Sequence, residues 1–492
     1  MRIFDNWVGG QWVPPEGGRY MGTDNPYTGK TWARIARSGA ADVDRAVAAA
    51  RAALEEGPWG RLTVVERASI LRRLGDLVRD NFEMLAKAET IDNGKTITEM
   101  RVQMRNVAEW YYYYAGLVDK ASGEFLPTER RNHLNYTCYE PLGVVALITP
   151  WNSPVRLLAW KLAPALAAGN VAVIKPSEFA STSTLIFCEL AGAAGIPPGV
   201  INAVTGLSSE AGEALVTHPH VAKIAFTGGP VGGAKIYEAA ARDFKSVTLE
   251  LGGKSPNIVF EDADIGRAAL GAATAIFGSY GQSCVAGSRL LVHEDVHDEI
   301  VGRIVEIAKS IRFGDPMDPD IDVGPIANRP QYEKILRYVE IAQSQGAKVV
   351  CGGRPMEVGG GLFIEPAVVT GVTNDMRIAQ EEVFGPVMSV IPFRDEAEAI
   401  QIANDSKYGL AAGIWTTNVN RAHRVAARLK AGSVWINTYR ITSQLSPFGG
   451  YKSSGVGREG GAEALRSYMQ VKSVWLDMNE TFTSPFKAVP AA

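Results

Sequence analysis

The chain has 492 residues, which is too long for one compact hydrophobic core, so we expect at least two domains. Its hydrophobic fraction of 46% and charged fraction of 21% are ordinary for a soluble globular protein. The net charge of -3 leaves no basic excess, which argues against nucleic acid or an anionic membrane as a partner. No run approaches the roughly 20 apolar residues that a membrane-spanning helix needs.

The four cysteines, Cys138, Cys188, Cys284 and Cys351, show no C-x-x-C or other paired metal-binding spacing. They favour a reducing compartment without disulfides, and we expect no metal site. The first residues, MRIFDNWVGGQWVPP, lack the basic start and apolar run of a secretory signal. Together these features predict a cytoplasmic protein.

The first part of the chain is predicted to be helical. Apolar residues at helical spacing predict helices over 41–57, 63–89 and 97–118. The segment 119–141 is polar and alternates in HLNYTCY, so we expect an extended arm or hairpin outside the main core. The tail MNETFTSPFKAVPAA has no helical period and is predicted either to be disordered or to lie on a neighbouring subunit.

Short apolar runs then alternate with helical stretches. The helical stretches are 155–168 and 180–195, and the runs are 143–148, 170–175, 201–206, 223–228 and 246–251. This alternation is typical of a parallel sheet covered by helices on both faces. With right-handed crossovers it predicts a doubly wound, nucleotide-binding type of domain.

A second series of strand-like runs extends from SPNIVF at 255–260 to GSVWIN at 432–437. The runs are separated by predicted helices at 263–277, 295–311, 329–344, 395–404 and 420–430. The series predicts a second α/β domain, and no internal repeat is visible.

Polar residues follow several of the predicted parallel strands. Asn152 follows GVVALITPW, Lys175 and Glu178 end NVAVIKPSE, and Glu250 ends SVTLE. Ligands bind at the carboxyl ends of such strands, so these residues predict a cofactor cleft, although each could also be a helix cap or a solvated loop residue. The glycines of GGPVGG at 228–233 can let backbone N–H groups approach a phosphate, or can form a plain tight turn.

The stretch YGQSCVAGSR places Cys284 among small and polar residues at the end of an apolar helical run. Free cysteine is among the most buried residue types, so this context alone favours a packing role.

Seven ordered motifs change that interpretation. They are PWNSP, KPSE, FTGG, ELGGKSP, GQSCVAGSR, EEVFGPV and PFGGYKSSGVGREGG. With them the chain closely resembles the NAD(P)-dependent aldehyde dehydrogenase superfamily over nearly its full length. The resemblance implies an α/β fold with a Rossmann-like doubly wound cofactor domain at 1–118 and 142–252 and an α/β catalytic domain at 253–452. It also implies a small β oligomerisation arm and tail at 119–141 and 453–492, and a homodimer or homotetramer.

The resemblance gives Cys284 the role of nucleophile, whose thiolate attacks an aldehyde to form a thiohemiacetal and then, after hydride loss, a thioester. The Asn152 amide and the Cys284 backbone N–H are implied to stabilise the oxyanion, and Glu250 to act as general base. Lys161 and Glu459 match a proton-relay pair. The other three cysteines match no functional position.

The resemblance also implies a dinucleotide site. A carboxylate at Glu178 accepts from ribose hydroxyls and repels a 2′-phosphate, which favours NAD over NADP. Gly229, Val231 and Ser208 depart from the common residue types, which puts details of pyrophosphate binding in question. The implied cofactor contacts are Ile148, Trp151, Lys175, Glu178, Gly228, Gly229, Lys334, Glu382 and Phe384.

The substrate tunnel is implied to include Ser153, Arg156, Trp160, Arg440, Thr442 and Phe448. Its two arginines predict either a site for a carboxylate-bearing aldehyde or pairs with local acids at subunit contacts. A CoA-acylating enzyme is also conceivable on this fold, but Glu250 argues against it. The retention of Cys284, Asn152 and Glu250 together argues against a non-enzymatic structural or binding role.

Overall fold

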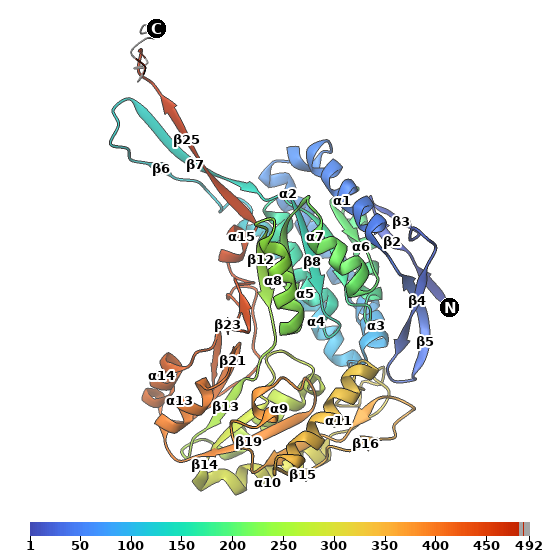
Figure 1. Ribbon diagram of the computed structural model, residues 1–492, viewed down its shortest axis with the longest axis vertical. Helices are drawn as coiled ribbons and strands as arrows, with labels where there is room; N and C mark the ends of the chain where they lie inside the picture. Colours follow the sequence, from blue (N-terminus) through green and yellow to red (C-terminus); the bar gives the residue numbers. More distant parts are fainter. Residues whose placement is uncertain (482–485, 487–492) are drawn as a thin grey trace.

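Two large β-sheets organise the chain, and a long β arm projects away from them (Figure 1). The computed structural model describes residues 1–481 and residue 486. Most of the segment predicted as a disordered or docking tail therefore lies outside the described residues. The mixed α/β architecture confirms the predicted fold class.

The first sheet has eight strands in the order β24-β12-β11-β8-β9-β10-β2-β3, and its five strands from β12 to β10 are parallel. Their bounds are β8 Val144–Thr149, β9 Val171–Pro176, β10 Ile201–Ala203, β11 Val221–Thr227, β12 Ser246–Glu250, β24 Gly455–Val456, β2 Asn6–Val8 and β3 Gln11–Val13. The chain runs from β8 outward through β9 and β10, and then returns to the other side of β8 for β11 and β12. The winding direction reverses between β8 and β11, which is where open α/β sheets bind ligands.

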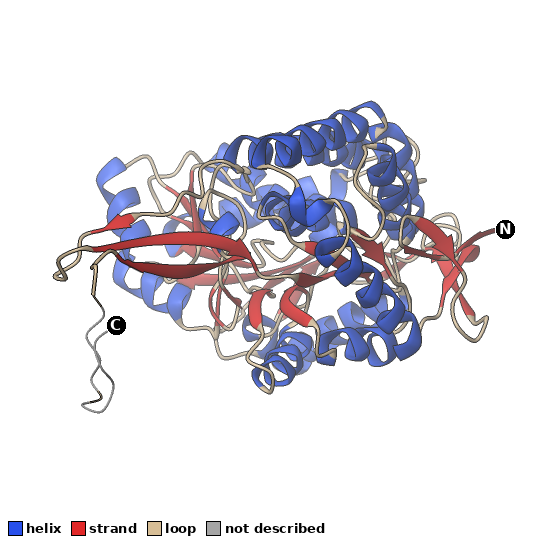
Figure 2. Cartoon of the chain, turned by 90° about the horizontal axis from the view of Figure 1, so that it is seen from above, coloured by secondary structure: helices blue, strands red, loops and turns tan. Residues whose placement is uncertain are grey.

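Helices cover both faces of this sheet (Figure 2). They are α1 Ala40–Glu55, α2 Val64–Asp80, α3 Phe82–Asn93, α4 Ile97–Leu117, α5 Pro154–Ala167, α6 Thr182–Ala193, α7 Glu213–Thr217 and α8 Pro230–Ala241. The prediction of one helix over 63–89 is wrong, because Asn81 separates α2 from α3. The Asn81 side-chain amide donates to the Leu77 carbonyl oxygen at 2.8 Å and so satisfies a carbonyl at the end of α2.

The second sheet has seven strands in the order β15-β18-β19-β14-β13-β21-β22, all parallel except the edge strand β15. The strands are β13 Pro256–Val259, β14 Arg289–His293, β15 Lys348–Cys351, β18 Ala367–Thr370, β19 Val387–Phe393, β21 Ala411–Trp415 and β22 Ser433–Ile436. The helices are α9 Ile265–Phe277, α10 His297–Ser310, α11 Arg329–Ser344, α12 Arg377–Gln380, α13 Glu396–Asn404 and α14 Val419–Arg428.

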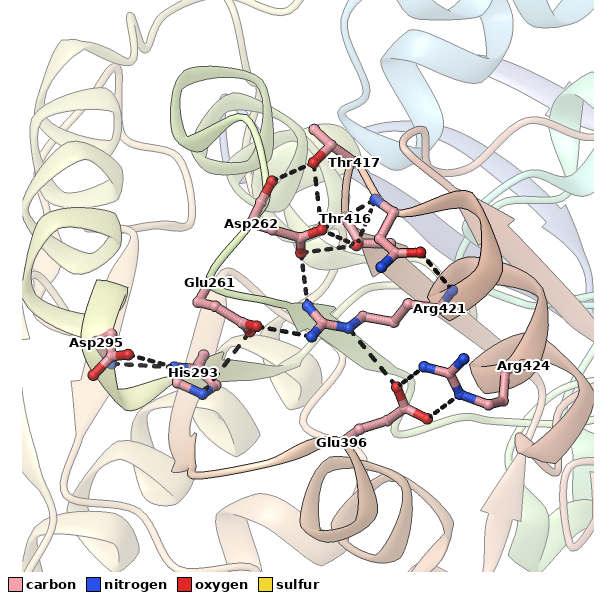
Figure 3. A network of polar contacts seen from close by, with 10 residues as sticks. Glu261, Asp262, His293, Asp295, Glu396, Thr416, Thr417, Arg421 and Arg424 are labelled. Carbon is pink, nitrogen blue, oxygen red and sulfur yellow. Dashed lines mark hydrogen bonds and ion pairs between the residues drawn. The ribbon is translucent and has the colours of Figure 1, made fainter.

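Arg421 of α14 joins three parts of this second unit (Figure 3). Its guanidinium donates to Glu261 and Asp262, which follow β13, at 2.8 Å each. It also lies 3.7 Å from the Glu396 carboxylate at the start of α13 and packs over the Phe260 ring. Because one cation serves three carboxylates, the contacts brace two helices against the end of a central strand.

The arm is a three-stranded sheet in the order β25-β7-β6. The strands are β6 Phe125–Leu126, β7 His133–Pro141 and β25 Met469–Asp477. β7 and β25 pair from Met469 opposite Pro141 to Asp477 opposite His133. The predicted extended arm at 119–141 is therefore present, and its long partner strand comes from the C-terminal part of the chain.

Smaller elements complete the fold. They are the sheet of β1 Arg2–Phe4, β5 Lys30–Ala36 and β4 Tyr20–Asn25, the pairs β16 Pro355–Met356 with β17 Phe363–Ile364 and β20 Tyr408–Gly409 with β23 Tyr451–Lys452, and α15 Glu463–Arg466. Within the described residues, no helix is long and apolar enough to cross a membrane.

Candidate functional site

A cavity of about 160 Å³ lies where the carboxyl ends of β8, β11 and β12 face the second unit. The loop after β8 contributes Trp151 and Asn152, the loop after β11 contributes Gly228, and β12 contributes Glu250 at its last position. Cys284 lies in the opposite wall. The remaining lining residues are Pro150, Leu157, Thr227, Gly229, Leu251, Gly252, Gln331, Lys334, Glu382 and Phe384.

Two glycines after β12 allow the walls to meet. A Cβ on Gly252 would overlap the Glu382 carboxylate, and one on Gly253 would lie 2.7 Å from the Cys284 carbonyl oxygen. The Gly253 N–H donates to Glu382 at 3.1 Å. The ELGGK segment therefore allows Glu250, Cys284 and Glu382 to lie around one cavity, because it has no side chains at these two positions.

Cys284 follows a strained turn at the end of α9. Ser279 and Tyr280 have φ values of 52° and 54°, a left-handed conformation that non-glycine residues rarely adopt. The Asn152 amide reaches the same segment and donates to the Gln282 carbonyl oxygen at 3.0 Å. Burial, together with the Glu382 and Glu250 charges, raises the pKa of the Cys284 thiol to about 12. The thiol is therefore protonated at neutral pH and needs a base.

Glu250 lies in the wall of the same cavity. It is 4% exposed, and within the described part of the chain neither carboxylate oxygen has a hydrogen-bond partner. Burial and the Glu459 charge raise its pKa well above the ordinary value, while Lys161 and Arg458 oppose this shift. Lys161 forms an ion pair with Glu459 and donates to the Thr227 hydroxyl at 2.6 Å.

The residues expected to hold a dinucleotide fit that ligand. Lys175 and Glu178 form a 3.4 Å ion pair beside the carboxyl end of β9. Gly229 has open space where a Cβ would be, and α8 begins at the next residue with its N–H groups toward the cavity end of β11. Glu382 and Phe384 lie in the cavity wall, and Phe384 packs edge-on against Trp151. Ile148, the second-to-last residue of β8, is buried below these residues.

Four of the predicted substrate residues are joined by contacts. Arg156 donates to the Thr442 hydroxyl at 2.6 Å and lies over the Trp160 ring, which packs edge-on against Phe448. Burial and the guanidinium of Arg440 lower the pKa of Arg156. The charge of Arg156 opposes the upward shift of the Cys284 pKa, so Arg156 is close enough to act on this thiol electrostatically.

Sequence reasoning missed other charged and polar groups near these arginines. Buried Lys95 forms an ion pair at 3.1 Å with Glu99, which is partly buried, and Lys95 also donates to Ser153. Ser279 accepts from Arg440 and donates to the same Glu99 carboxylate. Lys95 and Glu99 are four residues apart, a spacing that allows a local ion pair, but no sequence pattern joins them to Ser153 or Ser279, because those contacts exist only in the folded chain.

Gln331 was missed for the same reason. Its amide donates to the carbonyl oxygens of Val383 and Phe384 at 2.8 and 3.0 Å, and so holds the loop that carries Glu382. Phe384 itself has a φ of 62°, and these two bonds help to keep it in that conformation.

The sequence matches the model of the aldehyde dehydrogenase family over residues 12–474. The chain belongs to that family. It is 45% identical over 482 residues to the (Z)-2-((N-methylformamido)methylene)-5-hydroxybutyrolactone dehydrogenase of Acinetobacter baylyi, with 98% of each chain covered. The NAD⁺ complex of an aldehyde dehydrogenase from Bacillus cereus superposes with a TM-score of 0.95 at 44% identity, covering 97% of each chain. An NAD⁺ complex of betaine aldehyde dehydrogenase from Staphylococcus aureus gives a TM-score of 0.96 at 39% identity, covering 98% of this chain and 96% of the other.

This aldehyde dehydrogenase is therefore an oxidoreductase that acts on aldehydes with NAD. The family resemblance and the expected cofactor are confirmed.

The raised pKa of Cys284 predicts how the thiol of the ligand-free protein reacts. Since only the thiolate is nucleophilic, its alkylation by iodoacetamide should speed up about tenfold per pH unit between about pH 7 and about pH 9. The Arg156→Leu variant should react more slowly at each pH, because it lacks the nearby positive charge. Peptide mass spectrometry follows the reaction, with Cys284→Ala identifying the labelled peptide. A rate that is already flat at neutral pH would contradict the raised pKa.

Proposed function

We propose that this aldehyde dehydrogenase oxidises its substrate to the carboxylic acid through covalent intermediates on Cys284. The observation that supports this most directly is the meeting of Cys284, Asn152 and Glu250, from three separate segments, around one cavity. The arrangement provides a nucleophile, an oxyanion donor and a base within one enclosed volume.

In the first step Glu250 takes the thiol proton, and the sulfur attacks the aldehyde carbon to form a thiohemiacetal. The Asn152 amide and the Cys284 backbone N–H stabilise the developing oxyanion. NAD, when bound, supplies the hydride acceptor that converts this adduct to a thioester. Glu250 then takes a proton from water, which attacks the thioester carbon and releases the acid and the cysteine.

The paired roles of Cys284 and Glu250 can be separated by mutation. Cys284→Ala should lower kcat at least about 10⁴-fold, since it removes the nucleophile. Glu250→Gln should lower kcat by about 10²–10⁴-fold and weaken the decline of activity at acid pH, since the raised pKa of Glu250 leaves the base protonated there.

The measurement is NADH absorbance across pH, and Asp243→Asn, which changes an exposed acid, serves as a control. Full activity of Cys284→Ala would refute the mechanism. Release of acyl-CoA on addition of CoA would instead place the protein in the acylating branch.

We further propose that the substrate is an aldehyde that bears a carboxylate. Arg156, Arg440 and Lys95 supply three cations, whereas Glu99 supplies one carboxylate that both Lys95 and Ser279 already use. A second acid, Glu89, is fully buried and its pKa is raised to about 7, first of all by that burial. The positive charge that remains lies on the substrate side of Cys284, where a guanidinium binds a carboxylate well.

The Acinetobacter relative is named for a 5-hydroxybutyrolactone. Such a lactone is the cyclic isomer of a 4-oxo acid, an aldehyde that carries a carboxylate, which agrees with this substrate class. A quaternary ammonium aldehyde such as betaine aldehyde would instead be repelled by Arg156.

Arg156→Leu and Arg440→Leu should each lower kcat/KM for ω-carboxylated aldehydes about tenfold to a hundredfold. A loss of this size corresponds to the free energy that a charge-assisted hydrogen bond usually contributes. The comparison substrate is the plain aldehyde of the same length. Its kcat/KM should change little in Arg440→Leu, and in Arg156→Leu it should fall less than that of the carboxylated aldehyde, because both substrates share the loss of thiolate stabilisation at Cys284. Arg156→Lys, which keeps the charge, serves as the matched control. An equal response of both aldehydes would reject the carboxylate site.

Two further features belong to this proposal. Glu178 at the carboxyl end of β9, paired with Lys175, favours NAD over NADP because a 2′-phosphate would meet its carboxylate. The arm supports a homodimer or homotetramer, since Val471, Trp475 and Leu476 of β25 expose large apolar side chains.

Oligomer formation through the arm is testable by light scattering. Val471→Lys combined with Trp475→Lys should shift the protein to a smaller species, because two charges replace apolar contact surface. Val350→Lys, which alters an exposed valine of β15, should not change the mass. A wild-type monomer at micromolar concentration would contradict the proposal.

A further inference from the structure

Polar side chains occupy one face of β11 and β12 from the active site to the far end of the sheet, except at Ala225 in the middle of β11. The parallel register pairs Thr227 with Glu250 and Lys223 with Ser246. Side chains alternate along a strand, so these four and Thr248 lie on the same face. The opposite face carries the apolar residues Ile224 and Phe226.

At the active-site end, Glu250 and Thr227 line the cavity. Lys161 connects Thr227 to Glu459, and both members of that ion pair are almost completely buried. Within the described residues, the second Glu459 oxygen has no hydrogen-bond partner, which leaves it free to accept a hydrogen bond.

At the other end lies Lys223, which is 1% exposed. Its ammonium donates to the Thr248 hydroxyl at 2.8 Å and to the Ser246 hydroxyl at 3.4 Å, and it lies 4.9 Å from the centre of the Tyr468 ring. Thr248 is buried, whereas Ser246 is exposed. The polar face therefore begins at the reacting groups and ends at solvent.

Burying the charged Lys223 ammonium costs free energy. Burial lowers its pKa to about 8; the charges that face it are Glu459, which favours the ammonium, and Lys161, which opposes it. It forms no ion pair within the described residues, so its ammonium is compensated mainly by two hydroxyls and an aromatic face. An amine that changes protonation state so easily suits a group that passes protons on.

We propose that Lys223 conducts protons from Glu250 and the Lys161–Glu459 pair to solvent at Ser246. The proposal rests on the proposed function, in which Glu250 is the base. With both substrates seated the cavity is filled, so a proton released inside it needs a route through the protein.

The proton balance of the reaction requires such a route. Oxidation of an aldehyde by NAD and water gives a carboxylate, NADH and two protons. One proton leaves the Cys284 thiol as the carbon–sulfur bond forms. The attacking water gives up both of its protons as the thioester is cleaved, and one of these returns to the cysteine sulfur. Glu250 receives each departing proton, Glu459 and Lys161 pass it on, and Lys223 takes it up and releases one toward Ser246.

The test is Lys223→Met, which keeps the length of the side chain and removes the amine. In weak buffer its kcat should fall about tenfold, which is below the full effect of a general base. The acyl adduct on Cys284 should accumulate during turnover, as measured by intact mass after quenching. A high concentration of imidazole should restore kcat of the variant and leave the wild type unchanged, because a small base can carry the proton instead.

Lys245→Met is the matched control. Lys245 is also buried, but its ammonium donates to the Val216 and His218 carbonyl oxygens, away from the active site. We expect unchanged kcat and no response to imidazole in this variant.

If Lys223→Met does not fold, Thr248→Val and Ser246→Ala should show a smaller fall in kcat with the same imidazole rescue. A normal kcat in Lys223→Met, or a loss that imidazole does not restore, overturns the proton route while leaving the chemistry of Cys284 intact. Absence of any acyl adduct on Cys284, in the wild type and in all variants, overturns the covalent mechanism and the proton route together.

Discussion

The close approach of three segments at Gly252 and Gly253 is the constraint on which the active site depends. Here the loop after β12 runs between Glu382 and the Cys284 backbone, and neither position has room for a Cβ. The constraint is steric, so it fixes position without using hydrogen bonds that the chemistry needs. Glu250, two residues earlier, is thereby held in the wall of the cavity that Cys284 also lines.

Burial sets the behaviour of the ionisable groups around this point. It raises the pKa of both Cys284 and Glu250. The same burial lowers the pKa of Lys223. One physical cause thus shifts the pKa of the Glu250 carboxyl upward and that of the Lys223 amine downward, which favours proton transfer between a carboxyl and an amine of this kind.

The cationic side chains near the proposed substrate site are held mainly by hydrogen bonds and an aromatic ring. Glu99 is shared by Lys95 and, through Ser279, by Arg440, while Arg156 is held by the Thr442 hydroxyl and the face of Trp160. These contacts orient the Arg156 guanidinium without neutralising it. A cation held in this way can meet an anionic substrate with little loss of conformational freedom.

The sequence by itself determined the family, the doubly wound sheet and the catalytic residues proposed here. Ordered motifs such as ELGGKSP and GQSCVAGSR, and apolar runs such as GVVALI, are local patterns that can be recognised without knowledge of the fold. The break between α2 and α3 was not predictable in this way, since Asn81 interrupts a helical pattern that continues on both sides.

Only the tertiary structure decided which distant side chains meet. The contact of Lys95 with Ser153, the Ser279 bridge to Arg440 and the position of Lys223 beside Tyr468 join residues that share no motif. Hydrogen bonds and charge interactions act over a few ångströms in space, whereas sequence patterns report only the period of one strand or helix. The reaction could therefore be inferred from the motifs, while the proposed substrate pocket and the proposed proton route depend on contacts that only the folded chain shows.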